Sequence, residues 1–141
     1  MAKFSYPDKE TLTFFIGIIT NGDFTVSKYL PGIDEEWYRI IGNCIELLQI
    51  ASKYTDLSIE AACAEMLYKV AKRHEFGDGN KRSAVITVFI FSYVNGFWVR
   101  DPKLLKLQAK IIASTKGRVK EEVIKQRVAL RLKSTLMEIE E

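Results

Sequence analysis

The sequence has few of the residues from which metal sites and disulfide frameworks are built. Its 141 residues include one histidine and two cysteines. One histidine leaves almost no material for a histidine-ligated metal site. Cys44 and Cys63 are too far apart for a Cys-x-x-Cys unit and lie in apolar helical patterns, so we expect both to be reduced, buried residues of a cytoplasmic protein.

Long hydrophobic segments are absent as well. The two longest mainly apolar runs, at 12–19 and 85–94, are much shorter than the roughly 20 residues that a membrane-spanning helix needs. The first run follows a stretch of mixed charge rather than the basic segment of a signal peptide. We therefore expect no membrane span and no targeting segment.

The net charge is small for a nucleic-acid-binding domain. It is +3, from 21 basic and 18 acidic residues. The excess lies in residues 101–141, which carry 10 basic and 6 acidic residues but no aromatic residue on which a base could stack. We expect most of these basic side chains on solvated helix faces, and we do not expect nucleic-acid binding.

The sequence does contain enough apolar material for one folded domain spanning residues 1–141. Apolar residues make up 48% of the chain and charged residues 28%, a balance that excludes a disordered chain. A chain of this length buries a sizeable core without the help of metal ions or disulfides.

Helix start and stop signals predict an all-α fold with six helices. The residues expected to cap the first five helices are Asp8, Asp34, Ser58, Asn80 and Asp101, and a sixth helix is expected from Val119 onward. The helix that follows Asn80 is apolar nearly all round, so we expect it to be buried at the centre of the fold. Residues 23–33, which contain the turn dipeptide Pro31-Gly32, predict a loop or a short β-hairpin.

Residues 74–83, His-Glu-Phe-Gly-Asp-Gly-Asn-Lys-Arg-Ser, concentrate the chemistry of the chain. Gly77 and Gly79 allow backbone N–H groups to converge on an anion, and the N-terminus of the next helix adds a partial positive charge. Lys81 and Arg82 add full positive charges. The segment therefore predicts a phosphate site, although its spacing fits neither a Walker loop nor the dinucleotide-binding fingerprint.

This segment resembles the signature of the Fic/Doc family, His-x-Phe-x-(Asp/Glu)-Gly-Asn-(Gly/Lys)-Arg. The matching residues are His74, Phe76, Asp78, Gly79, Asn80, Lys81 and Arg82. The resemblance implies the compact six-helix fold of that family, with a buried central helix after the signature. It also implies that residues 23–33 form a flap that aligns an extended segment of a target protein.

Two positions favour one branch of the family. Fic enzymes that transfer AMP usually have glycine where Lys81 stands and a second arginine where Val85 stands. The death-on-curing (Doc) toxins have lysine, and they transfer the terminal phosphate of ATP to a protein hydroxyl. The resemblance therefore implies a toxin kinase that acts on a Ser or Thr hydroxyl, with a translation elongation factor as the expected target. AMP transfer is the alternative, and a binding module without catalysis is a third.

The residue types suit phosphoryl transfer. A neutral imidazole accepts a hydroxyl proton near pH 7, so His74 is the candidate general base. Asp78 is the candidate ligand of Mg²⁺, which binds proteins through one or two carboxylates and the nucleotide phosphates. The candidate ligands of the ATP phosphates are Gly77, Gly79, Asn80, Lys81 and Arg82. Asp78 could instead simply cap the following helix.

The resemblance implies a second protein partner besides the target. Doc toxins are neutralised by an antitoxin whose disordered segment folds on the toxin, and the basic, apolar region 101–141 could accept such a segment. Some Fic proteins carry their own inhibitory helix instead. Ser134 and Glu138 have the spacing of that motif, but Ile139 departs from it, so we interpret the match as coincidental.

Overall fold

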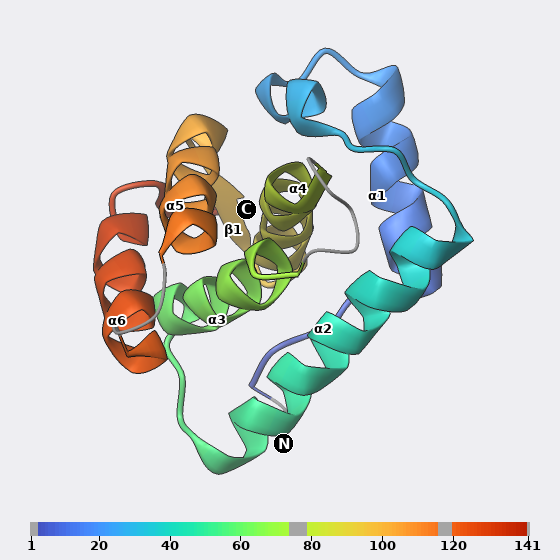
Figure 1. The fold of residues 1–141 in the computed structure, drawn as a ribbon. Helices are drawn as coiled ribbons and strands as arrows, with labels where there is room; N and C mark the ends of the chain where they lie inside the picture. Colours follow the sequence, from blue (N-terminus) through green and yellow to red (C-terminus); the bar gives the residue numbers. More distant parts are fainter. Residues whose placement is uncertain (1–2, 74–78, 116–119, 141) are drawn as a thin grey trace.

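The computed structural model describes residues 3–73, 79–115 and 120–140. In these ranges the chain forms six α-helices, one short 3₁₀ helix and two short strands (Figure 1). The elements are α1 (Lys9–Asn21), η1 (Thr25–Tyr29), α2 (Glu35–Tyr54), α3 (Ile59–Ala71), α4 (Gly79–Val94), β1 (Phe97–Val99), α5 (Pro102–Ser114), α6 (Glu121–Leu132) and β2 (Leu136–Glu138). The predicted all-α fold with six helices is confirmed.

Four of the five predicted helix caps are confirmed. The side chains of Asp8, Asp34, Ser58 and Asp101 each accept a hydrogen bond from a backbone N–H in the first turn of the helix that follows. Caps of this kind contribute about 1 kcal/mol each. The prediction for Asn80 is wrong, because α4 begins at Gly79 and Asn80 is buried inside its first turn. Packing in the tertiary structure here overrides the local preference of asparagine for a cap.

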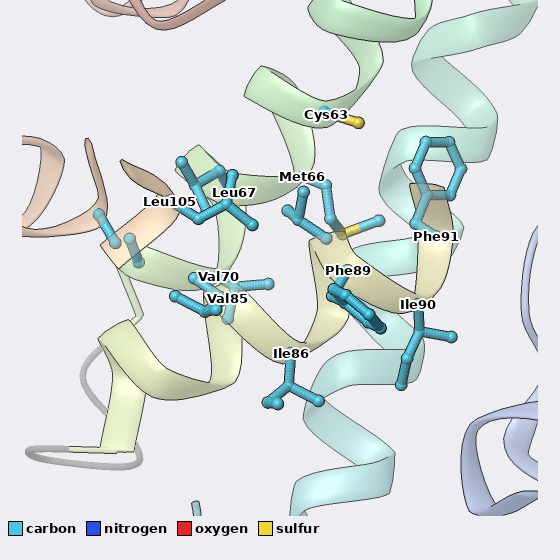
Figure 2. Close-up of a cluster of buried hydrophobic side chains, with 14 of the residues drawn as sticks. Cys63, Met66, Leu67, Val70, Val85, Ile86, Phe89, Ile90, Phe91 and Leu105 are labelled. Carbon is cyan, nitrogen blue, oxygen red and sulfur yellow. The ribbon is translucent and has the colours of Figure 1, made fainter. Parts of the chain in front are cut away.

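Helix α4 is the centre of the fold, as its sequence predicts. It packs against α3, α5, η1 and β1, and Figure 1 shows it lying between α5 and α1. Figure 2 shows side chains from three helices meeting around it. They are Cys63, Met66, Leu67 and Val70 of α3, Val85, Ile86, Phe89, Ile90 and Phe91 of α4, and Leu105 of α5.

Neither cysteine forms a disulfide and both are buried, as predicted. Burial raises the pKa of the Cys63 thiol to about 12, although its sulfur lies within hydrogen-bonding distance of the Ser92 hydroxyl, at 3.3 Å. The thiol is therefore protonated and inert near pH 7. No helix in the described part of the chain is long and apolar enough to cross a membrane.

The segment 23–33 does not form the hairpin that was one of its two predicted forms. Its middle is the 3₁₀ helix η1, in which Val26 and Tyr29 are both buried. Residues three apart lie on one side of a 3₁₀ helix, so both side chains reach the core together. The Ser27 hydroxyl fixes the segment to α1 by donating to the carbonyl oxygen of Ile19 at 2.9 Å.

The chain also forms a small sheet that the sequence does not predict. Strands β1 and β2 pair antiparallel, with Trp98 opposite Met137. Each strand has three residues, too few for an alternating pattern to be recognised. Gly96, with a φ of +87°, makes the turn from α4 into β1. Since residues 136–138 are a strand, the spacing of Ser134 and Glu138 is not that of a helical motif here.

Candidate phosphate site

The structure describes four of the predicted site residues, and all four lie in the first turn of α4. They are Gly79, Asn80, Lys81 and Arg82. His74, Phe76, Gly77 and Asp78 lie outside the described residues. The roles predicted for His74, Gly77 and Asp78 therefore stay predictions, whereas the surroundings of the helix start can be described directly.

A buried hydrogen bond fixes this first turn. The indole Nε1 of Trp37, on α2, donates to the Ser83 hydroxyl at 2.9 Å, and neither residue is exposed. The Thr87 hydroxyl, one turn later, donates to the carbonyl oxygen of Ser83 at 2.7 Å. Helix α2 thereby holds the residue that directly follows Arg82. Lys81 and Arg82 project from a turn whose position is set by the core.

The helix start is electrostatically suited to an anion. The first N–H groups of a helix have no partners within the helix, and the helix dipole places a partial positive charge there. The first turn of α4 contains no acidic residue. Lys81 is half-buried and Arg82 is exposed. Among the described carboxylates, none forms an ion pair with either cation.

Helix α5 brings further positive charge to this turn. Burial lowers the pKa of Lys106, and nearby positive charges lower it further. These charges are, in order of effect, those of Arg82, Lys81 and Lys110. We call Lys81, Arg82, Lys106 and Lys110 the cation cluster. An anion bound among these four side chains would relieve their mutual repulsion.

The 3₁₀ helix η1 lies beside the cation cluster. The ammonium groups of Lys28 and Lys106 lie 5.2 Å and 5.8 Å from the centre of the Tyr29 ring. Cations at this distance from an aromatic face are attracted by the ring. Tyr29 therefore joins η1 to α5 and adds Lys28 to the positive surroundings. The segment expected to be a flap thus adjoins the candidate phosphate site, although its backbone differs from the predicted hairpin.

The sequence does not indicate that α5 contributes to the candidate phosphate site. Lys106 and Lys110 are one helical turn apart, a spacing that also suits a solvated face. Which face of α5 meets α4 depends on tertiary packing.

Lys72, which adjoins residues 74–82 in the sequence, makes a structural contact. Its ammonium donates to the Thr115 carbonyl oxygen at 2.8 Å.

The predicted magnesium site depends on one expected ligand, the carboxylate of Asp78. Among the residues that the structure describes, no three His, Cys, Asp or Glu side chains gather around a common point. A site that uses one carboxylate and the phosphates of the nucleotide needs no such group. The carboxylate of Asp78 has the hard oxygen atoms that Mg²⁺ prefers, so the predicted donor suits the ion.

Comparison with known proteins identifies no relative of this chain. No family model, no curated protein and no solved structure matches it. The functional assignment therefore depends on the residues 74–82 and on the cation cluster at the start of α4.

Proposed function

We propose that this protein is a Doc-like toxin kinase that transfers the terminal phosphate of ATP to a Ser or Thr hydroxyl of a target protein. The observation that carries the proposal is the cation cluster, in which Lys81 and Arg82 of the signature-like residues 74–82 lie near Lys106 and Lys110 of α5. A translation elongation factor is the proposed target, an antitoxin the proposed inhibitor, and the cytoplasm the proposed location.

Phosphoryl transfer depends mainly on holding the phosphates and neutralising their charge. The start of α4 supplies the partial positive charge of a helix N-terminus and the side chains of Lys81 and Arg82. Lys106 adds charge from a second helix, so bound phosphates would meet cations from more than one element. This arrangement supports the binding of a polyphosphate rather than of a single carboxylate, since a single carboxylate would leave most of the charge uncompensated.

The residues outside the described ranges complete the proposed chemistry. His74 would accept the proton of the target hydroxyl as its oxygen attacks the terminal phosphorus. The bond to the bridging oxygen breaks, and ADP leaves. Asp78 would hold Mg²⁺, which supplies charge neutralisation to the phosphates when bound. Gly77 would contribute a backbone N–H.

The burial of Val85 favours phosphate transfer over AMP transfer. AMP-transferring Fic enzymes usually have a second arginine at this position, but here Val85 is fully buried against the core. Val85 therefore supplies no second arginine to the site. The cations of this chain come instead from the first turn of α4 and from α5.

The proposal is tested by incubating the protein and a cell lysate with ATP labelled either at the γ or at the α phosphorus. We expect a protein of the lysate to take up the γ label alone, and His74→Ala to abolish the labelling. Lys133→Gln, which removes an exposed lysine from another part of the chain, is the control and should leave labelling intact. Uptake of the α label would show AMP transfer, and labelling that survives His74→Ala would overturn the proposed role of His74.

A further inference from the structure

Strand β2 has one edge that pairs with nothing in the described structure. The sheet has two strands, and Arg100 N and Ile139 N donate across it to Thr135 O and Gly96 O, both at 2.8 Å. Hydrogen-bonded pairs alternate along an antiparallel ladder. The backbone groups of Met137 therefore face β1. Those of Leu136 and Glu138 point to the other side, where a further strand could bind them.

An apolar surface lies next to this edge. Tyr93, Met137 and Ile139 are 41%, 47% and 38% exposed, and together with Trp98 they line an open hollow. Trp98 and Met137 are directly opposite each other and share one face of the sheet. A strand added to β2 would place every second side chain on this face, next to Met137.

A second, smaller pocket lies beside α1. It has a volume of about 110 Å³ and is lined by Tyr93 and Trp98 together with Phe15, Ile18 and Phe24. The ring of Trp98 packs edge-on against Phe89, with 5.2 Å between ring centres. Trp98, which forms part of the wall of the hollow, is thus anchored on the core. An aromatic or aliphatic side chain that enters it meets a preformed surface.

The open edge is acidic. Glu138 lies on β2 itself, and Glu140 follows two residues later at the rim of the same hollow. Both are exposed, and no lysine or arginine of the described residues pairs with either carboxylate. A second copy of the chain would bring carboxylates of the same kind to this edge. A basic segment would neutralise them.

We propose that β2 is a docking edge for an extended, basic segment of a partner protein. The segment adds as a third strand, bonds to the backbone groups of Leu136 and Glu138, and places its lysines or arginines near Glu138 and Glu140. Its alternate apolar side chains cover Met137 and enter the hollow beside Tyr93 and Trp98. This is recognition by strand addition, in which the backbone provides affinity and the side chains provide selectivity. The surface is separate from the cation cluster, and the inference does not depend on the proposed kinase activity.

The test uses the full chain and two synthetic octapeptides, blocked at both ends. In one, lysine alternates with leucine or valine; in the other, glutamate replaces each lysine. Fluorescence anisotropy measures the affinity, and NMR measures hydrogen exchange at the amides of Leu136 and Glu138. We expect the basic peptide to bind, the acidic peptide not to bind, and both amides to become protected.

Two variants separate strand addition from general charge attraction. Glu138→Pro removes an N–H that points away from β1, a substitution that edge strands tolerate. It should weaken binding of the basic peptide by roughly tenfold, the effect of losing one hydrogen bond and one charge pair. Glu138→Lys with Glu140→Lys should reverse the preference between the peptides. Glu10→Lys with Glu46→Lys, which changes the net charge equally at exposed positions of α1 and α2, should leave the preference unchanged.

Three results would overturn the proposal. One is the absence of peptide binding, which would mean that Glu138 and Glu140 serve only to keep the edge free. The second is binding that Glu138→Pro does not weaken, while NMR shows the variant folded. The third is a dimeric chain in which the amides of Leu136 and Glu138 are already protected without peptide, because a second copy would then occupy the edge.

Discussion

Trp37 on α2 donates from its indole Nε1 to the hydroxyl of Ser83 on α4, at 2.9 Å and out of contact with solvent. The bond joins two residues 46 positions apart in the sequence, and it fixes the helix turn that carries Lys81 and Arg82. A structural contact of the core thereby positions the start of the candidate phosphate site.

Replacing Trp37 by phenylalanine should destabilise the protein and loosen this turn. The change leaves the buried Ser83 hydroxyl without its donor and creates a small cavity, so we expect a loss of about 2–4 kcal/mol in the free energy of unfolding. Urea denaturation measures it. Ser83→Ala in the Trp37→Phe background is the control. If the Trp37–Ser83 hydrogen bond stabilises the fold, Ser83→Ala should lower the free energy of unfolding little further in the Trp37→Phe background. Full additivity of the two single effects would contradict this role of the bond.

Lys125 of α6 is predicted to be the most important charged residue for stability. Its ammonium lies 2.9 Å from a carboxylate oxygen of Glu65 on α3 and 2.6 Å from one of Glu121, and it is largely buried. Lys125→Met leaves the half-buried carboxylate of Glu65 with Lys69, at 3.3 Å, as its remaining ion-pair partner, which should cost about 1–3 kcal/mol. Thermal or urea unfolding measures the loss. Lys133→Met, at an exposed position, should change stability by less than about 0.5 kcal/mol.

The contribution of Lys125 to stability should also depend on pH. The hydrogen bond from Lys125 lowers the pKa of Glu121 below its ordinary value of 4.5, against a smaller opposing effect of burial. A lowered pKa in the folded state stabilises the protein above pH 4.5, and that stabilisation disappears as the pH falls toward the folded value. The difference in stability between the original chain and Lys125→Met should therefore shrink below pH 4.5. A constant difference down to pH 3 would contradict the ion pair.

Lys106 should contribute to nucleotide binding although it lies outside residues 74–82. Lys106→Gln removes one cation of the cluster and should weaken ATP binding about threefold to tenfold, as expected for a partly solvated charge contact. Calorimetry at two salt concentrations measures the affinity for ATP, and the affinity of the variant should change less with salt than that of the original chain. Lys103→Gln is the matched control, because Lys103 lies on the same helix but is exposed. Equal effects of the two variants would mean that the cluster acts only through the total charge.

Replacing each of two glycines by alanine should change the stability of the protein in opposite directions. Gly96 has a φ of +87°, so Gly96→Ala should cost about 1–2 kcal/mol of stability and loosen the turn into β1. Gly17 lies in α1, and an added Cβ would meet no atom within 4 Å. Gly17→Ala should therefore stabilise the protein by about 0.5–1 kcal/mol. Melting temperatures measured side by side give both signs, and a neutral Gly96→Ala would contradict the strained turn.

The helices were predictable from the sequence because their signals are local. Asp34 and the apolar positions of α2 lie within one segment, and so do Asp101 and Pro102 at the start of α5. The sheet was not predictable, since β1 and β2 are three residues each and pair across about 40 positions of sequence. Segment 23–33 was predicted as a loop or a short β-hairpin, and its 3₁₀ helix was not predicted, because the burial of Val26 and Tyr29 that accompanies it depends on tertiary packing.

The candidate site was predictable in part. Lys81 and Arg82 were expected at the start of a helix, and the structure places them there. Lys106 was not expected, because the sequence does not say which face of α5 turns toward α4. The cap predicted at Asn80 failed because α4 begins at Gly79, so that Asn80 lies inside the helix as a buried residue.

The mass of the modified target tests the central claim most directly. Purified translation elongation factor is incubated with ATP, Mg²⁺ and either the original chain or His74→Ala, and is then examined by intact and peptide mass spectrometry. We expect a gain of one phosphate on a Ser or Thr residue, with no gain in the His74→Ala reaction. A gain of AMP, or a phosphate that appears equally with His74→Ala, would contradict it.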